Sequence, residues 1–267
     1  MEYSAIASGS SGNCIFVRGN GTGLLIDAGI TGKRICANLC ELGCNPQTDV
    51  HGLLVTHEHQ DHVCGVGVVA RKLGVPVYAN EATWHGMKPF IGKIPDDKRQ
   101  FFRSGETFII GDLQITSFCT SHDARESVGY IIDDGRVKLG IVTDTGLLTP
   151  EMLRVLKSVD ELILEANHDL DMLQKGRYPW PLKKRIMGDF GHLSNRAAAA
   201  AVEFLVRNGR ISEGRVLLGH LSEENNRPEL VLKEVLARFD QAKIMPGRDI
   251  EIELASRDQR TPLYKVG

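Results

Sequence analysis

The stretch of this 267-residue chain most able to do chemistry is residues 52–62, where an apolar run leads directly into His57, His59, Asp61 and His62. Residues two apart in an extended segment project to the same side, so His57 and His59 can bind one ion together. Asp61 and His62 follow at the next turn and can reach a second ion. A polar loop whose histidines only form hydrogen bonds is the alternative, but such loops rarely follow a buried strand with so many ligand types. The spacing therefore predicts part of a two-metal site, with ions about 3.5–4 Å apart as in hydrolytic enzymes.

Three more candidate ligands each lie just beyond a later apolar run, namely His122, Asp144 and His220. A lone His or Asp after a strand is more often a capping or surface residue, but the repeated placement strengthens the prediction, because loops at strand ends carry function. We expect two ligand sets joined by a bridging carboxylate, Asp144. The first set is His57, His59 and His122. The second set is Asp61, His62 and His220.

The elements that position these residues are predicted from apolar periodicity and from glycine-rich turns. Strands are expected at residues 6–8, 14–18, 23–27, 53–56, 75–79, 107–110, 113–119, 127–133, 137–142, 161–164 and 215–218. Helices are expected at residues 31–42, 62–73, 195–207 and 228–239. Strands throughout the chain with helices between them indicate two sheets covered by helices, in a layered α/β domain. No repeat or linker marks a boundary, so residues 1–267 are expected to form one domain.

Composition limits the class of partner. A net charge of −2 argues against a protein that coats nucleic acid with its whole surface, so a polyanion would have to meet a local patch. No run approaches the roughly 18 apolar residues that span a bilayer, and the N-terminus lacks a basic region followed by an apolar core. These features predict a cytoplasmic protein without a membrane partner and leave its oligomeric state open.

Residues 175–185 hold five cationic side chains, two aromatic side chains and no acid. Phosphate contacts are predicted for Arg177, Lys183 and Lys184, and Tyr178 or Trp180 could stack on an end base. The alternative is a solvated basic helix whose aromatic side chains pack on the core. A contact of the first kind would make cleavage fall steeply with salt.

A glycine-serine loop at residues 8–13 offers a second candidate contact. Gly9 and Gly12 would let backbone amides approach an anion, and Ser10 or Asn13 could then hold a terminal phosphate. A plain turn is the alternative interpretation.

The His-x-His-x-Asp-His run, the later His122, the Thr-Asp-Thr at Asp144 and the Gly-His at His220 together resemble the metallo-β-lactamase superfamily in order and context. Three further segments are similar to its YycJ/WalJ-like branch: Ala-Ser-Gly-Ser-Ser-Gly-Asn-Cys at 7–14, Leu-Glu-Ala-Asn-His-Asp at 164–169 and Gly-His-Leu-Ser-Asn at 191–195. The resemblance runs from about residue 3 to about residue 240. It implies a four-layer αββα sandwich with a dinuclear site and a 5′-to-3′ exonuclease acting on DNA.

Phosphodiester hydrolysis at such a site needs a nucleophile and an acid. Two divalent ions would supply hydroxide at neutral pH, with Asp61 and Asp144 fixing the water. His192 is the expected acid for the leaving group, since it lies outside the metal-bearing strands and is similar to a histidine of superfamily phosphodiesterases. His168 is the competing acid, although Asn167 and His168 could instead contact phosphate. Histidine-rich ligation suits zinc, whereas carboxylate with phosphoryl substrates suits manganese.

Two alternatives to a DNA exonuclease remain open at this point, because one fold hosts many reactions. The first is a phosphodiesterase acting on a small or cyclic phosphodiester. The second is a non-catalytic, metal-bearing regulatory binding protein, against which the intact ligand set weighs.

Overall fold

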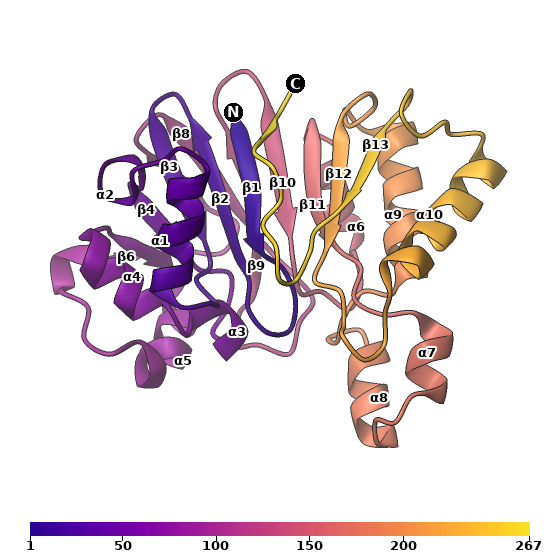
Figure 1. Cartoon of the computed structure of the whole chain (residues 1–267), viewed down its shortest axis with the longest axis horizontal. Coiled ribbons are helices and arrows are strands. Elements are labelled where there is room, and N and C mark those ends of the chain that lie inside the picture. The colour runs from indigo at the N-terminus through magenta and orange to yellow at the C-terminus, as the bar shows by residue number, and fades with distance from the viewer.

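The computed structural model describes all 267 residues, and two seven-stranded sheets pack face to face with helices on both outer sides (Figure 1). The first sheet has the order β14-β1-β2-β3-β4-β5-β6, and the second has the order β13-β12-β11-β10-β9-β8-β7. The predicted αββα sandwich is therefore confirmed.

The strands of the first sheet are β1 (Glu2–Ala7), β2 (Cys14–Gly19), β3 (Thr22–Ile26), β4 (Gly52–Leu54), β5 (Val77–Ala79), β6 (Arg99–Phe101) and β14 (Tyr264–Lys265). Those of the second are β7 (Thr107–Ile110), β8 (Leu113–Cys119), β9 (Val128–Asp133), β10 (Lys138–Val142), β11 (Glu161–Glu165), β12 (Arg215–Gly219) and β13 (Glu251–Leu254). The helices are α1 (Gly32–Glu41), α2 (Pro46–Asp49), α3 (Gln60–Val63), α4 (Val66–Leu73), α5 (Glu81–Ile91), α6 (Pro150–Leu156), α7 (Leu170–Lys175), α8 (Trp180–Met187), α9 (Asn195–Asn208) and α10 (Pro228–Ala242), with a 3-10 turn at Asp96–Lys98. No helix combines the length and the apolar character needed to span a bilayer.

Three hydrophobic layers hold the sandwich together. Successive residues of a strand point to opposite faces, so each strand supplies two layers. In β2, Ile15 and Val17 face the other sheet, whereas Phe16 packs under α1, α4 and α5. In β11, Ile163 faces inward and Leu162 packs under α6, α9 and α10. Apolar runs without alternation are therefore the strands buried on both faces.

The predicted helix at residues 62–73 is wrong in its continuity, because α3 and α4 are separate. Gly65 lies between them, and its amide donates to the carbonyl of Ala28 at 2.7 Å. A Cβ at this position would lie 2.2 Å from the carbonyl oxygen of Ile30, so glycine is required for the close approach. Sequence patterning also missed α5, α7 and the edge strands β6, β13 and β14, and it offered α8 only as the alternative interpretation of the basic stretch.

Strand direction brings the predicted ligands to one edge. β3 and β4 are parallel, and β10, β11 and β12 are parallel, while β8 runs with them because it pairs antiparallel to β9 and β9 to β10. Their carboxyl ends meet at the edge that carries α3, and Figure 1 shows α7 and α8 projecting from the same edge. Catalytic loops gather at such ends in α/β proteins.

Backbone conformation marks this edge as unusual. Asp27, Asp144 and His220 each follow a strand there, and each has a positive φ, of 59°, 21° and 55° respectively. Non-glycine residues rarely adopt this region, and such conformations cluster at functional sites.

Candidate metal centre

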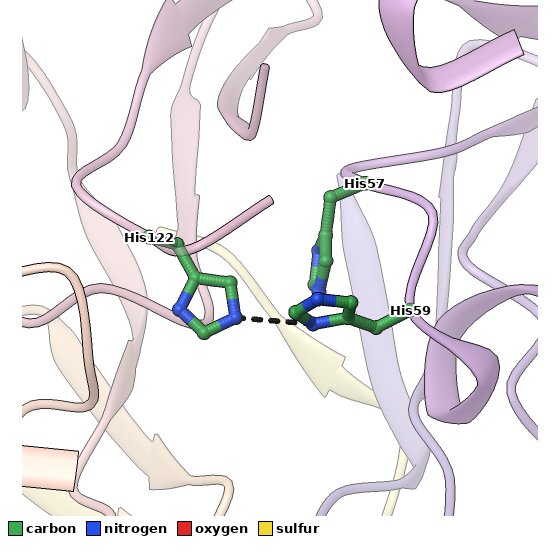
Figure 2. Close-up of side chains that lie close together, drawn as sticks. All are labelled: His57, His59 and His122. Carbon is green, nitrogen blue, oxygen red and sulfur yellow. Dashed lines mark hydrogen bonds between the residues drawn. The ribbon is translucent and has the colours of Figure 1, made fainter. Parts of the chain in front are cut away.

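The first predicted ligand set comes together as expected. His57 and His59 follow β4, His122 follows β8, and their ligand atoms lie within 4.8 Å of one another (Figure 2). His122 Nε2 is 3.2 Å from His59 Nδ1. His57 Nε2 is buried without a hydrogen-bond partner. A buried, unpaired imidazole nitrogen beside two others is costly unless a ligand occupies the space between them.

The second set forms beside it. Asp61, His62, Asp144 and His220 also lie within 4.8 Å of one another. Asp144 Oδ2 is 2.7 Å from His62 Nε2 and 3.3 Å from His57 Nε2, so one carboxylate oxygen faces a member of each set. His220 Nε2 is buried without a hydrogen-bond partner, 3.7 Å from Asp61 Oδ2. This geometry fits the bridging position predicted for Asp144.

Four of these histidines use their other ring nitrogen to bond an orienting group. The contacts are His57 Nδ1 with Thr56 Oγ1 at 3.0 Å, His62 Nδ1 with Asp27 Oδ2 at 2.7 Å, His122 Nδ1 with the Gly191 carbonyl at 2.9 Å and His220 Nδ1 with Glu165 Oε1 at 2.8 Å. Such partners fix the ring and leave the inner nitrogen free for a metal. The buried donor set therefore fits divalent ions.

Asp27 and Glu165 were not predicted as site residues, although the signal used for the ligands was present. Asp27 directly follows the apolar strand β3, and Glu165 is the last residue of β11. Asp27 also accepts from Thr56 through its backbone N–H and its hydroxyl, both at 2.8 Å. Both carboxylates act behind the ligands, holding the imidazoles in place.

Glu165 joins the metal site to the predicted acid. Its Oε1 lies 2.7 Å from His192 Nδ1 as well as 2.8 Å from His220 Nδ1, and its Oε2 accepts from the amides of Thr145 and Leu193. His192 retains 24% side-chain exposure, so its Nε2 edge can face a substrate. The structure thus brings His192 beside the metal ligands, with its ring oriented by a buried carboxylate.

Charge balance in the site differs between the two ligand sets. Burial lowers the pKa of His57 well below its ordinary value, and that of His59 to a smaller extent. Burial also opposes charge on His62, but the carboxylates of Asp144 and Asp27 outweigh it and raise the pKa to about 10. In Glu165 burial raises the pKa, but the nearby His192 and His220 lower it by more and leave it at about 2. Without a metal, the carboxylate-rich half of the site is therefore protonated on His62 at neutral pH.

His168 does not reach the site surface. It is 1% exposed, neither ring nitrogen has a hydrogen-bond partner, and burial lowers its pKa to about 4. A neutral, enclosed imidazole cannot donate a proton to a leaving group, so His168 is corrected to a packing residue.

The glycine-serine loop reaches the centre through Asn13. Asn13 Nδ2 lies 3.0 Å from His62 Nε2, and its Oδ1 accepts from the Gly9 amide at 2.9 Å. Asn13 is buried and its amide faces the predicted ligand His62, and its phosphate contact stays a prediction. Ser10 remains exposed and lines a cavity with His192 and Asn167. Asn167 donates through Nδ2 to the His220 carbonyl at 3.0 Å.

The basic stretch forms a helical hairpin, α7 and α8, but its charges are largely neutralised. Lys183 is buried, and its Nζ donates to the carbonyls of Gln174 and Gly176, so its predicted phosphate contact is corrected to a hairpin-closing role. Lys175, Arg177 and Arg185 form ion pairs with Asp171, Glu224 and Asp123 respectively. Lys184 is exposed and makes no ion pair.

The two aromatic residues of the hairpin lie in different surroundings. Tyr178 lines the cavity beside His192, together with Leu182 and Arg185. Trp180 is 58% exposed at the start of α8 and does not pack on the core. Exposed indole rings beside a site are available for stacking.

Comparison with known proteins matches residues 22–220 to the β-lactamase superfamily domain. Over the whole chain and 98% of the relative's length, the sequence is 39% identical to exodeoxyribonuclease WalJ of Streptococcus pneumoniae. It is 41% identical to exodeoxyribonuclease YycJ of Bacillus anthracis over 94% of both chains. The metallo-β-lactamase fold protein YhfI of Bacillus subtilis superposes with a TM-score of 0.72 at 16% identity, over 97% of this chain and 98% of that one.

Replacing Asp27 with Asn should weaken metal binding without removing a ligand. The charged partner of His62 Nδ1 is lost, and such orienting groups contribute about 10–100-fold in metal affinity. Competition with a chromophoric chelator measures the change, and Asp112→Asn, at an exposed carboxylate away from the site, is the control. Equal affinities for the two variants would contradict the orienting role.

Metal uptake should release protons. His62 binds metal through a neutral ring but is protonated without metal up to about pH 10, so each ion bound there must displace a proton. Apparent affinity should consequently rise with pH through the neutral range. Titration calorimetry in buffers of different ionisation enthalpy gives the proton count, expected at about one or more for the ion that His62 binds. A count of zero would contradict the protonated state.

Proposed function

Because the chain belongs to the β-lactamase superfamily and is related over nearly its full length to exodeoxyribonucleases, we propose that it is a metal-dependent exonuclease that removes nucleotides from the 5′ ends of duplex DNA. The observation that carries the proposal is the complete ligand set, His57, His59, Asp61, His62, His122, Asp144 and His220, gathered at one edge of the fold. A role in DNA repair in the cytoplasm accords with this substrate.

Two divalent ions, zinc or manganese, would lower the pKa of a shared water toward neutrality and bind phosphate oxygens at the scissile bond. His57, His59 and His122 would hold one ion, and Asp61, His62 and His220 the other. Asp144 Oδ2 lies near a histidine of each set, and Asp144 and the part-exposed Asp61 would fix that water. Desolvation lowers the pKa of His57 and His59 and so favours the neutral form that ligates a metal.

His192 supplies the acid in this proposal. Burial lowers its pKa, but the Glu165 carboxylate raises it by more, and the net shift is upward. A histidine held protonated by a buried carboxylate can donate from Nε2 to a leaving alkoxide while Nδ1 stays bonded to Glu165. His168 is excluded from this role by its enclosure.

The terminal nucleotide has a place beside His192. A cavity of about 170 Å³ is lined there by Ser10, Asn167 and Tyr178, among other residues. The aromatic ring of Tyr178 is positioned to contact a base, and Ser10 to contact a terminal phosphate. Arg177 and Lys184 lie farther out on the hairpin, where exposed ion pairs are weak and can exchange for phosphate.

A small or cyclic phosphodiester is the second candidate substrate, since the same ligands and acid would act on it. A non-catalytic metal-binding role is less well supported, because His192 and Glu165 are arranged for proton transfer as well as for structure. The exonuclease and small-phosphodiesterase activities can be distinguished by the substrate that is cleaved.

Duplex DNA labelled at one 5′ end and, separately, at one 3′ end tests the function. With manganese, magnesium or zinc, the 3′-labelled strand should shorten progressively while the 5′ label is released as a mononucleotide. Asp144→Asn is the control and should abolish cleavage with the DNA still bound. Hydrolysis of a small phosphodiester without any shortening of DNA would select the alternative.

His192→Ala should lower turnover on DNA by about 10²–10⁴-fold, because alkoxide departure loses its acid, while metal content is unchanged. On a phosphodiester with a nitrophenolate leaving group, which departs without protonation, the loss should be much smaller. His51→Ala, at an exposed imidazole outside the centre, is the matched control. An equal loss on both substrates would assign His192 a role other than acid.

A further inference from the structure

A cavity outside the metal centre lies between α5 and the edge strand β6, with a volume of about 560 Å³. Ligand pockets typically measure about 300–1,000 Å³ and have aromatic walls with a few polar groups. Here the rings of Trp84 and Phe101 form the wall, with centroids 5.6 Å apart at 37°. Phe101 is 61% exposed, so an aromatic face is left open to solvent at a pocket of ligand size.

Hydrogen bonds hold this pocket in shape. Trp84 Nε1 donates to the Gln100 carbonyl at 3.0 Å, tying α5 to β6. Arg71 Nη1 donates to the carbonyls of Ile91 and Lys93 at 2.9 and 3.1 Å, fixing the rim where α5 ends. A preformed site loses less entropy on binding than one that must be ordered.

Charge around the pocket is positive although the chain as a whole is not. Lys88 and Lys93 line it and form no ion pair, whereas Arg99 pairs with Asp96. Glu81 is the one carboxylate in the lining. An aromatic wall flanked by unpaired ammonium groups is the arrangement that binds a nucleobase together with its backbone phosphates.

Helix α5, which forms one wall of the pocket, packs against the loop that carries His57 and His59. Gly86 of α5 packs against Glu58, which lies between the ligands His57 and His59, and a Cβ at Gly86 would lie 2.5 Å from Glu58 Cγ. In Figure 1, α5 and α8 lie on either side of α3 along the same edge of the sandwich. A strand crossing the centre from the hairpin would therefore pass toward α5.

We propose that this pocket binds an unpaired nucleotide of a single-stranded DNA segment, with its base against Phe101 and Trp84 and its phosphates at Lys88 and Lys93. The inference rests on the proposed function for the identity of the polymer. It adds a second DNA contact on the side away from α7 and α8, where most hairpin cations are already paired.

An acidic peptide adding to the free edge of β6 is the competing occupant. The Gln100 carbonyl is already bonded to Trp84, and β6 is only three residues long, so little backbone is left for strand addition. Strand addition would use backbone groups, whereas the aromatic and cationic groups of the pocket belong to side chains. This difference favours the nucleotide over the peptide.

Binding of metal-loaded protein to phosphorothioate oligonucleotides, which resist cleavage, tests the proposal. Fluorescence anisotropy should show that wild type prefers a duplex with a single-stranded tail, on the 5′ or the 3′ end in separate experiments, over a blunt duplex. Phe101→Ala should weaken tailed binding about fivefold or more and abolish the preference. Lys88→Gln with Lys93→Gln should raise Kd about tenfold and reduce the slope of log affinity against log salt by about 1.4.

The matched control removes two exposed lysines far from the pocket, Lys33→Gln with Lys233→Gln, and should bind as wild type does. Turnover on a small chromogenic phosphodiester should be unchanged in every variant, which shows that each is folded and metal-loaded.

Equal DNA affinity in wild type and pocket variants would overturn the proposal. It would also be overturned if the pocket variants lost binding to an acidic peptide while they still bound DNA as wild type does. These outcomes are distinct from failure of the nuclease function. DNA binding that depends on the pocket, without cleavage, would establish the contact and contradict only the proposed nuclease function.

Discussion

Face-to-face packing of the two sheets is the interaction on which the rest of the structure depends. The first sheet supplies His57 and His59 after β4, whereas the second supplies His122, Asp144 and His220 after β8, β10 and β12. No single sheet holds a complete ligand set. The inner layer, which includes Tyr130 and Ile163, therefore fixes the separation of the two halves of the metal site. Apolar burial, a nondirectional force, here sets distances that ligation requires to within fractions of an ångström.

Much of the site could be predicted because one rule, a polar ligand directly after an apolar strand, covers most of its members. The rule does not distinguish the roles of such residues, which is why Glu165 and Asp27 were missed. A carboxylate at the end of a strand can bind a metal or can orient an imidazole, and only the direction of its side chain decides between these roles. Lys183 shows a different limit. In a charge-rich stretch, nothing in residue type reveals that one ammonium will be buried to satisfy two carbonyl oxygens.

Helix boundaries failed for a related reason. The apolar pattern continues from His62 to Leu73, yet the chain breaks at Gly65 because the Ala28 and Ile30 carbonyls come close to it from a distant segment. Tertiary contact thus overrides local periodicity. The result matters for the site, because a separate α3 lets Asp61 and His62 turn toward the metal ligands while α4 follows the core. Short edge elements such as β6 carry too little pattern to be found at all.

Asp27, Asp144 and His220 hold left-handed backbone conformations that cost on the order of 1 kcal/mol each, and the first two also bury negative charge. Without metal, protonated His62 offsets part of this charge, and bound divalent cations would offset more of it and stabilise the strained loops. With metal bound as proposed, folding and metal supply would be coupled in the cell. When metal is scarce, the chain would spend more time open to proteases, so that its abundance, and not only its activity, would follow the metal status of its surroundings.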